Sequence, residues 1–215
     1  MSRPRGVAAF DFDGTLTPSD TLVPFLARCY GRRRLFQAAA KVGPPWRVEA
    51  EVHRRDHAKA ELLRLLTAGD DGERVAALGR SYAVELERIL VPEMRERVEA
   101  HRHAGHELVA VSASLVSYLD PLLGERLGFD EVIAVELEVD DAGRLTGEMM
   151  HPNVRGLQKA IRLKEWLAAT GDADDTAVPE IWAYGNSSGD AELLAMADHA
   201  VLLGRRRAGG LPPGP

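Results

Sequence analysis

The sequence has little cysteine and no long hydrophobic run. Its single cysteine, Cys29, excludes an internal disulfide framework and a zinc site built from several cysteines. A membrane-spanning helix needs about 18 or more consecutive apolar residues, and no such stretch occurs. The sequence therefore predicts neither a disulfide framework nor a membrane span, and we expect no membrane contact.

An excess of positive charge is also missing. The 215 residues carry a net charge of −6 at pH 7, which argues against a protein that coats nucleic acid. The apolar run near the N-terminus is too short for a secretory signal, so we expect a cytoplasmic protein. A chain of this length that is 45% hydrophobic suits one α/β domain with an insertion, or two small domains.

The rest of the chain is organised around the stretch VAAFDFDGTLT, residues 7–17. Its first four residues are apolar, as in a buried parallel strand, and Asp11, Asp13 and Gly14 follow. In open α/β sheets, ligands bind beyond the carboxyl ends of the strands. Asp11 and Asp13 are therefore candidate functional residues. An ordinary strand end with two solvated aspartates is the alternative.

A helical insertion follows this stretch. Residues 18–20 form a helix-start signature, and residues 21–91 show apolar residues at helical spacing without a convincing strand pattern. The first half of the insertion is basic. Its positive side chains are Arg28, Arg32, Arg33, Arg34, Lys41, Arg47, Arg54 and Arg55. We interpret them as a solvated helix face, with a positive wall for an anionic substrate or a contact with anionic lipid as alternatives.

Two further strands are predicted after the insertion. Residues 106–112 indicate a buried strand that ends at Ser112, just before a helix pattern over residues 115–127. A hydroxyl between a strand and a helix start is well placed to bind an anion. Ser112 is the candidate for that contact, and Ser114 is interpreted as the N-cap of the helix. Residues 131–139 predict a strand, followed by a hairpin over residues 140–147.

A lysine and a polar loop mark the last part of the chain. Lys159 lies in the first turn of a helix predicted over residues 157–168, where its charge opposes the helix dipole. A nearby phosphate and carboxylate would give this lysine a physical reason to be there, and an ordinary surface lysine is the alternative. Residues 180–185 predict a strand, and residues 186–190 follow as a loop that resembles a metal-ligand loop. A simple turn capped by Asp190 is the alternative.

Polar groups thus stand at four places in the chain. In order and spacing they resemble the four signature motifs of the haloacid dehalogenase (HAD) superfamily, and they are Asp11 with Asp13, Ser112, Lys159, and Asn186 with Asp190. The strongest parts are DFDGTLT at residues 11–17 and YGNSSGDAELL at residues 184–194. The insertion resembles the small cap of the phosphoserine-phosphatase-like branch, subfamily IB. The resemblance implies a three-layer, Rossmann-like α/β fold with a parallel sheet and a helical cap inserted after the first strand. We expect residues 1–19 and 92–204 to form the core, residues 20–91 the cap, and residues 205–215 a disordered tail.

The resemblance also implies a phosphomonoester phosphatase that forms an aspartyl-phosphate. Asp11 would attack phosphorus, while Asp13 would protonate the leaving alcohol and then activate water. Other residues would hold the phosphoryl oxygens. The phosphate-binding positions that the resemblance implies are Ser112, Lys159, Gly14 and Ala113.

Mg²⁺ is the cofactor that the resemblance implies, and oxygen ligands suit this ion. The ligands would be Asp11, the backbone carbonyl of Asp13, and Asn186 and Asp190 in the last loop. Relatives commonly have aspartate where this chain has Asn186. Because an amide offers an oxygen without the charge, we expect weaker Mg²⁺ binding than with aspartate.

The sequence leaves the substrate open within the class of small organic phosphates. In phosphoserine phosphatases a glutamate after the first motif reads the substrate ammonium, and Asp20 holds that position here. A cap arginine reads the carboxylate, for which Arg47, Arg54 and Arg55 are candidates. Phosphoserine is one candidate substrate. The alternatives are a lipid-like phosphate of the phosphatidylglycerophosphate or lysophosphatidate type, a phosphotransferase reaction, and a non-catalytic binding module.

Overall fold

The computed structural model describes residues 6–43, 52–171 and 178–204. The helices in these ranges are α1 (Leu22–Val42), α2 (Val52–Thr67), α3 (Gly72–Glu87), α4 (Pro92–His103), α5 (Val116–Leu119), α6 (Leu157–Thr170) and α7 (Ala191–Ala195). The strands are β1 (Gly6–Phe10), β2 (Glu107–Leu115), β3 (Glu131–Val135), β4 (Leu137–Val139), β5 (Leu145–Met149), β6 (Glu180–Gly185) and β7 (His199–Leu202). Short helical turns cover Phe12–Leu16, Asp120–Gly124 and Ser188–Asp190.

Five parallel strands form the main sheet, in the order β3-β2-β1-β6-β7. The central strand β1 has neighbours on both sides, with Ala8 opposite Leu108 in β2 and Trp182 in β6. All five residues of β1 are buried, as expected for an apolar strand with both faces covered. The predicted α/β fold with a parallel sheet is confirmed.

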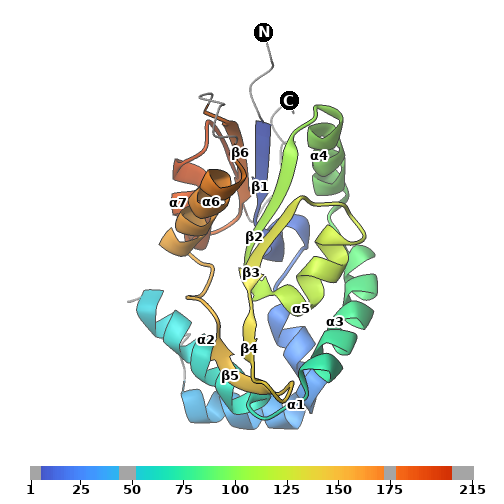
Figure 1. The fold of residues 1–215 in the computed structure, drawn as a ribbon, viewed down its shortest axis with the longest axis vertical. Helices are drawn as coiled ribbons and strands as arrows, with labels where there is room; N and C mark the ends of the chain where they lie inside the picture. Colours follow the sequence, from blue (N-terminus) through green and yellow to red (C-terminus); the bar gives the residue numbers. More distant parts are fainter. Residues whose placement is uncertain (1–5, 44–51, 172–177, 205–215) are drawn as a thin grey trace.

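Helices cover both faces of this sheet. Figure 1 shows α6 and α7 on one side and α4 and α5 on the other, which gives three layers. The carboxyl ends of the strands point toward α1, α2 and α3, the helices of the insertion (Figure 1). Any polar group placed just after a strand therefore faces the insertion.

The strand predicted over residues 131–139 is wrong in its extent. Strand β3 ends at Val135, Glu136 is exposed, and β4 pairs antiparallel with β5 rather than joining the main sheet. This hairpin packs on the end of α2, where the Gly69 amide donates to the Leu145 carbonyl at 2.8 Å. Residues 137–149 thus lie with the insertion, although the predicted division assigns them to the core.

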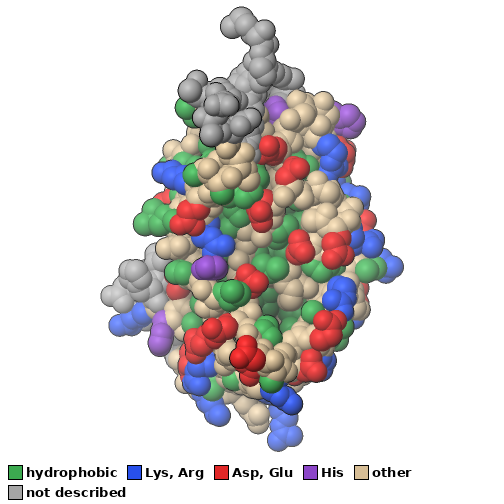
Figure 2. Space-filling model, viewed as in Figure 1, with side chains coloured by type: hydrophobic (Ala, Val, Ile, Leu, Met, Phe, Trp, Pro, Cys, Tyr) green, Lys and Arg blue, Asp and Glu red, His purple; other side chains and the backbone are tan. Residues whose placement is uncertain are grey.

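The surface carries both charge signs. On the face drawn in Figure 2, acidic and basic side chains are intermingled. In the ranges that the structure describes, no helix is long and apolar enough to cross a membrane. The predicted tail at residues 205–215 and the candidate Arg47 lie outside those ranges.

Candidate active site

Asp11 follows the last residue of β1 and is fixed from both sides of its carboxylate. Its amide donates to the Tyr184 carbonyl at 2.9 Å, which continues the pairing of β1 with β6. Its Oδ1 accepts from Lys159 Nζ at 2.6 Å and its Oδ2 accepts from Thr15 Oγ1 at 2.9 Å. Burial raises the pKa of Asp11, while Lys159 and Thr15 oppose that effect. The carboxylate is buried and held in one orientation.

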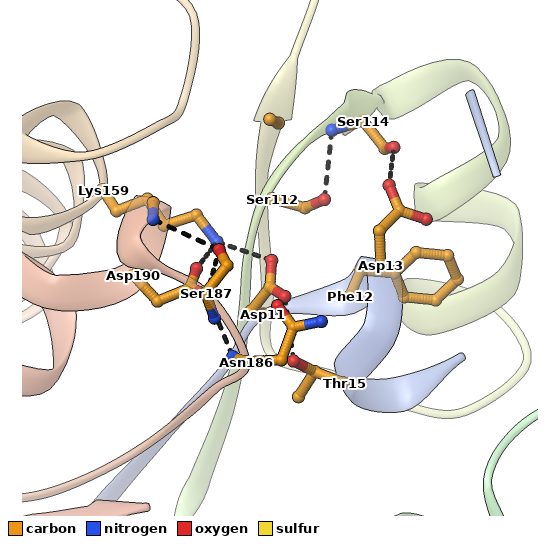
Figure 3. Close-up of polar contacts among 12 residues, drawn as sticks. Asp11, Phe12, Asp13, Thr15, Ser112, Ser114, Lys159, Asn186, Ser187 and Asp190 are labelled. Atoms are coloured by element: carbon orange, nitrogen blue, oxygen red, sulfur yellow. Dashed lines mark hydrogen bonds and ion pairs between the residues drawn. The ribbon is translucent and has the colours of Figure 1, made fainter. Parts of the chain in front are cut away.

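Asp13 lies two residues further on and points toward a different set of partners. Its Oδ1 accepts from the amide and the hydroxyl of Thr21, at 2.9 and 2.6 Å, and its Oδ2 accepts from Ser114 Oγ. Burial raises the pKa of Asp13 to about 6, against the hydrogen bonds from Ser114 and Thr21. One turn of chain therefore presents two acids in unequal environments (Figure 3).

Gly14 allows the chain to turn directly after Asp13. Its φ of 78° lies in the left-handed region that favours glycine. A Cβ at this position would also lie 1.8 Å from Asn186 Nδ2. Glycine is therefore required both for the backbone conformation and for the close approach of the last loop.

Lys159 joins two carboxylates inside the site. It enters from the first turn of α6 and its side chain is 3% exposed. Its Nζ lies 2.6 Å from Asp11 Oδ1 and 2.6 Å from Asp190 Oδ1 (Figure 3). Burial opposes its charge, but the two carboxylates hold the pKa of Lys159 above its ordinary value. The unfavourable position at the helix start is thus offset by a pair of buried acids.

Asp190 organises the loop after β6. Its Oδ2 accepts from the amides of Asn186 and Ser187, at 3.0 and 2.9 Å, and from Ser187 Oγ at 2.9 Å. With Oδ1 bonded to Lys159, both oxygens already have protein partners. Asp190 therefore fixes the position of Asn186, whose side chain lies beside Asp11 and Thr15 in Figure 3.

The two serines in the last part of β2, Ser112 and Ser114, have different contacts, and the strand continues past its predicted end at Ser112 to Leu115. Ser112 Oγ accepts from the Ser114 amide at 3.0 Å, so its own proton is available to donate to a ligand. The interpretation of Ser114 as a helix N-cap is wrong. Helix α5 has Leu115 at its N-cap position with no side-chain cap, and the Ser114 hydroxyl instead bonds Asp13.

A pocket of about 210 Å³ lies between this constellation and the insertion. Two of the three predicted substrate-selecting residues, Asp20 and Arg55, line it, and Arg54 is not among its described lining residues. Asp20 also accepts from the Val23 amide at 3.0 Å, at the start of α1. The other described lining residues are Asp13, Leu22, Asp56, Lys59, Ala113, Ser114, Asn153 and Arg155.

Sequence reasoning missed Lys59, which links the insertion to the core. From α2 it donates to the Ala113 carbonyl and, at 2.6 Å, to Asn153 Oδ1. The Asn153 Nδ2 donates in turn to Asp56 Oδ1 at 2.6 Å. Burial lowers the pKa of Lys59 to about 8. A lysine on an amphipathic helix carries no local mark of this role, so the sequence alone offered no signal for it.

Three arginines of the insertion have different surroundings. Arg28 pairs with Glu85 at 2.6 Å, and Arg34 donates to the Leu66 carbonyl at 2.9 Å, so both bond within the insertion. Arg55 lines the pocket. Arg55 thus faces the candidate site, whereas Arg28 and Arg34 bond within the insertion.

Comparison with known proteins places these features in a family context. The profile of the haloacid dehalogenase-like hydrolases matches residues 8–195, a range that contains every polar residue from Asp11 to Asp190. The protein CicA of Caulobacter vibrioides is 32% identical over 193 residues, which are 89% of this chain and 83% of CicA. A probable phosphatase of Mycobacterium tuberculosis is 27% identical over 206 residues, 94% of this chain and 69% of that protein.

Among solved structures, the phosphoserine phosphatase of T. onnurineus is similar in fold and sequence. It superposes with a TM-score of 0.55 and 25% identity, covering 94% of this chain and 82% of that one. The likeness extends over both the main sheet and the insertion, since so little of either chain is left uncovered.

Proposed function

Because the chain belongs to the haloacid dehalogenase-like hydrolase family, we propose that it is a Mg²⁺-dependent phosphomonoester phosphatase that works through an aspartyl-phosphate on Asp11. The observation that carries this proposal is the pair of acids at the end of β1. Asp11 is buried against a cation, while Asp13 has a pKa of about 6 and hydrogen bonds from two hydroxyls. Such a difference in the partners of the two buried acids suits a nucleophile and a proton donor.

In the first step a carboxylate oxygen of Asp11 attacks phosphorus, and the bond from phosphorus to the alcohol oxygen breaks. The proton of Asp13 moves to the leaving oxygen, so the alcohol departs neutral. In the second step the Asp13 carboxylate takes a proton from water as that water attacks the phosphoryl group. Asp11 is released as a carboxylate, and inorganic phosphate is the product.

Ser112 and Lys159 are the groups we assign to the phosphoryl oxygens. The Ser112 hydroxyl retains a proton to donate, since its oxygen accepts from Ser114. Lys159 is charged and already aligned on Asp11 at 2.6 Å. Donors fixed in advance stabilise developing charge without reorganising. The backbones of Gly14 and Ala113 are the further phosphate-binding positions in this proposal.

The charges and oxygens of the site fit a hard divalent cation. Asp11 and Asp190 share the single ammonium of Lys159, so an incoming phosphate dianion meets excess negative charge. In the described residues no three His, Cys, Asp or Glu side chains are grouped to hold a metal. The ligands that the family resemblance implies would be Asp11, the Asp13 carbonyl and Asn186, with Asp190 acting through the loop and waters completing the shell, as Mg²⁺ prefers. The ion would screen the repulsion between nucleophile and phosphate.

The test is hydrolysis of an aryl phosphate and of a panel of phosphorylated metabolites with Mg²⁺, using Asp11→Asn as the blank. Phosphate release that requires both Asp11 and Mg²⁺ supports the proposal. An added acceptor alcohol that becomes phosphorylated would indicate a phosphotransferase instead. Binding of inorganic phosphate without turnover of any ester would indicate a non-catalytic module and would overturn the proposal.

A further inference from the structure

An apolar chamber of about 520 Å³ lies between α1 and α2 in the insertion. Its described walls are mainly aliphatic and include Leu22, Leu35, Ala39, Val42 and Leu62. This volume falls in the range of about 300–1,000 Å³ typical of pockets for ligands of drug size. The chamber is larger than the polar pocket beside Asp13, which measures about 210 Å³.

The chamber and the polar pocket share a boundary. Leu22, Arg55 and Lys59 line both of them. The ammonium of Lys59 is bonded on the polar side, to the Ala113 carbonyl and to Asn153, so its aliphatic stem is the part that borders the chamber. A molecule that fills both spaces would have its polar end near Asp13 and its apolar end between α1 and α2.

The aliphatic walls of the chamber are incompletely covered by the residues that the structure describes. Leu22, Leu35 and Leu62 are only half-buried, and Val23 at the same site is 51% exposed. Apolar surface in contact with water favours any ligand that removes it from water. A leaving group as small as serine would stay within the polar pocket and leave these walls uncovered.

We propose that the chamber holds the aliphatic part of the leaving alcohol, so that the preferred substrates are phosphomonoesters of chain-bearing alcohols. This inference rests on the proposed phosphatase function, because the chamber then receives the group that Asp13 protonates. The reaction needs no further reactant. The bond between phosphorus and the alcohol oxygen breaks, that oxygen takes the Asp13 proton, and the alkyl chain leaves with it.

The test compares linear alkyl phosphates from methyl to hexyl phosphate, whose leaving alcohols differ little in basicity. Burial of each methylene is worth up to about fourfold in binding, so we expect kcat/KM to rise two- to fourfold per carbon. Ala39→Phe, which places an aromatic ring in the chamber and narrows it, is expected to abolish most of that rise. Ala40→Phe makes the same substitution at the next residue of the same helix, which is exposed and does not line the chamber, and is expected to retain the rise.

Binding of methylphosphonate and hexylphosphonate, measured by calorimetry, separates this inference from the proposed function. We expect hexylphosphonate to bind more tightly than methylphosphonate in the unmodified protein and in Ala40→Phe, and this difference to be lost in Ala39→Phe. That result supports the proposed role of the chamber even if no ester is hydrolysed. Hydrolysis of esters with no dependence on chain length, together with equal binding of the two phosphonates, overturns the inference and leaves the phosphatase proposal intact.

Discussion

Asp11 and Asp13 show how two identical side chains acquire different properties within one turn of chain. Asp11 is held by an ammonium and a hydroxyl in the interior, whereas Asp13 has hydroxyl and amide donors and no direct cation bond in the described structure. Burial raises the pKa of both acids, and the pKa of Asp13 rises to about 6. In the proposed mechanism, the environment and not the residue type distinguishes the acid that attacks from the acid that transfers the proton.

This assignment predicts the pH dependence of the first step. Asp13 must be protonated to act as an acid, so kcat/KM falls as the pH rises through about 6. Ser114→Ala removes a hydrogen bond that favours the carboxylate, which raises the pKa of Asp13 further. We expect the falling limb of the pH profile to move to higher pH by about one unit.

Ser114→Thr is the matched control for that experiment, because it keeps the hydroxyl, and its falling limb should stay in place. Steady-state kinetics across the falling limb is the measurement. A Ser114→Ala profile that does not move, or that moves to lower pH, would show that Asp13 is not the proton donor.

Asn186 gives a second prediction at the scale of one residue. Asn186→Asp replaces a neutral oxygen ligand with a charged one, so the Mg²⁺ concentration for half-maximal activity should fall by about tenfold, or about 1.4 kcal/mol. Ser188→Asp adds the same charge at an exposed position in the same loop and should have a much smaller effect. Equal effects of the two substitutions would argue against a metal ligand at position 186.

The candidate site residues whose placement was predicted from strand patterns share one property. Asp11 and Asn186 directly follow strands that an apolar run marks, Ser112 lies near the end of such a strand, and parallel strands bring these positions to one edge of the sheet. The partner of Ser114 could not be found in this way, because 101 positions separate it from Asp13. Hydroxyl orientation depends on the folded surroundings, so the local pattern favoured a helix cap instead.

At the scale of elements, α3 approaches α5 so closely that a glycine is needed. A Cβ on Gly79 would lie 1.9 Å from the Ser117 carbonyl oxygen, a backbone atom that cannot turn aside. Within an exposed helix, alanine is more stable than glycine by about 0.5–1 kcal/mol. Here we expect the opposite sign, with Gly79→Ala lowering the free energy of unfolding by about 1–3 kcal/mol.

Urea denaturation measures this change, and Arg80→Ala on the adjacent exposed position of α3 serves as the control. Its surface ion pair with Glu73 is worth at most about 1 kcal/mol. If Gly79→Ala stabilised the protein, helix propensity would outweigh the α3–α5 contact and the packing described here would be incorrect.

The sequence predicted well the extents of strands that lie wholly within the main sheet. Strand β1 is apolar throughout and β6 ends at a glycine, so their extents follow from the pattern. Residues 131–139 form two strands instead, because the chain leaves the main sheet after Val135 and the second part packs on α2. Alternation of apolar residues indicates a strand but not the sheet to which it belongs.

At the scale of the whole molecule, Lys59 couples the insertion to the core. Lys59→Met would leave the Ala113 carbonyl and Asn153 Oδ1 without this donor, at a cost of about 1–3 kcal/mol in the free energy of unfolding. Lys164→Met removes the same charge from an exposed position on α6 and should change the stability by less than about 0.5 kcal/mol. Chemical denaturation of both variants tests this, and equal stabilities would mean that the coupling is negligible.

The molecule as a whole has two regions that contribute different parts of the candidate site. The parallel sheet brings the acids, the serine and the lysine together, while the insertion supplies a pocket wall and an apolar chamber. Sequence patterns predicted the first region because it depends on strand ends. The second depends on how α1 and α2 pack, which no short motif records.

The central claim is that Asp11 becomes phosphorylated during turnover. The most direct measurement is a rapid quench of the protein with substrate and Mg²⁺, followed by borohydride reduction and mass spectrometry of the peptide that contains residues 7–17. An aspartyl-phosphate is reduced to homoserine, so the account predicts homoserine at position 11 and none in Asp11→Asn. Efficient turnover with no trapped product at position 11, or trapping at another residue, would contradict it.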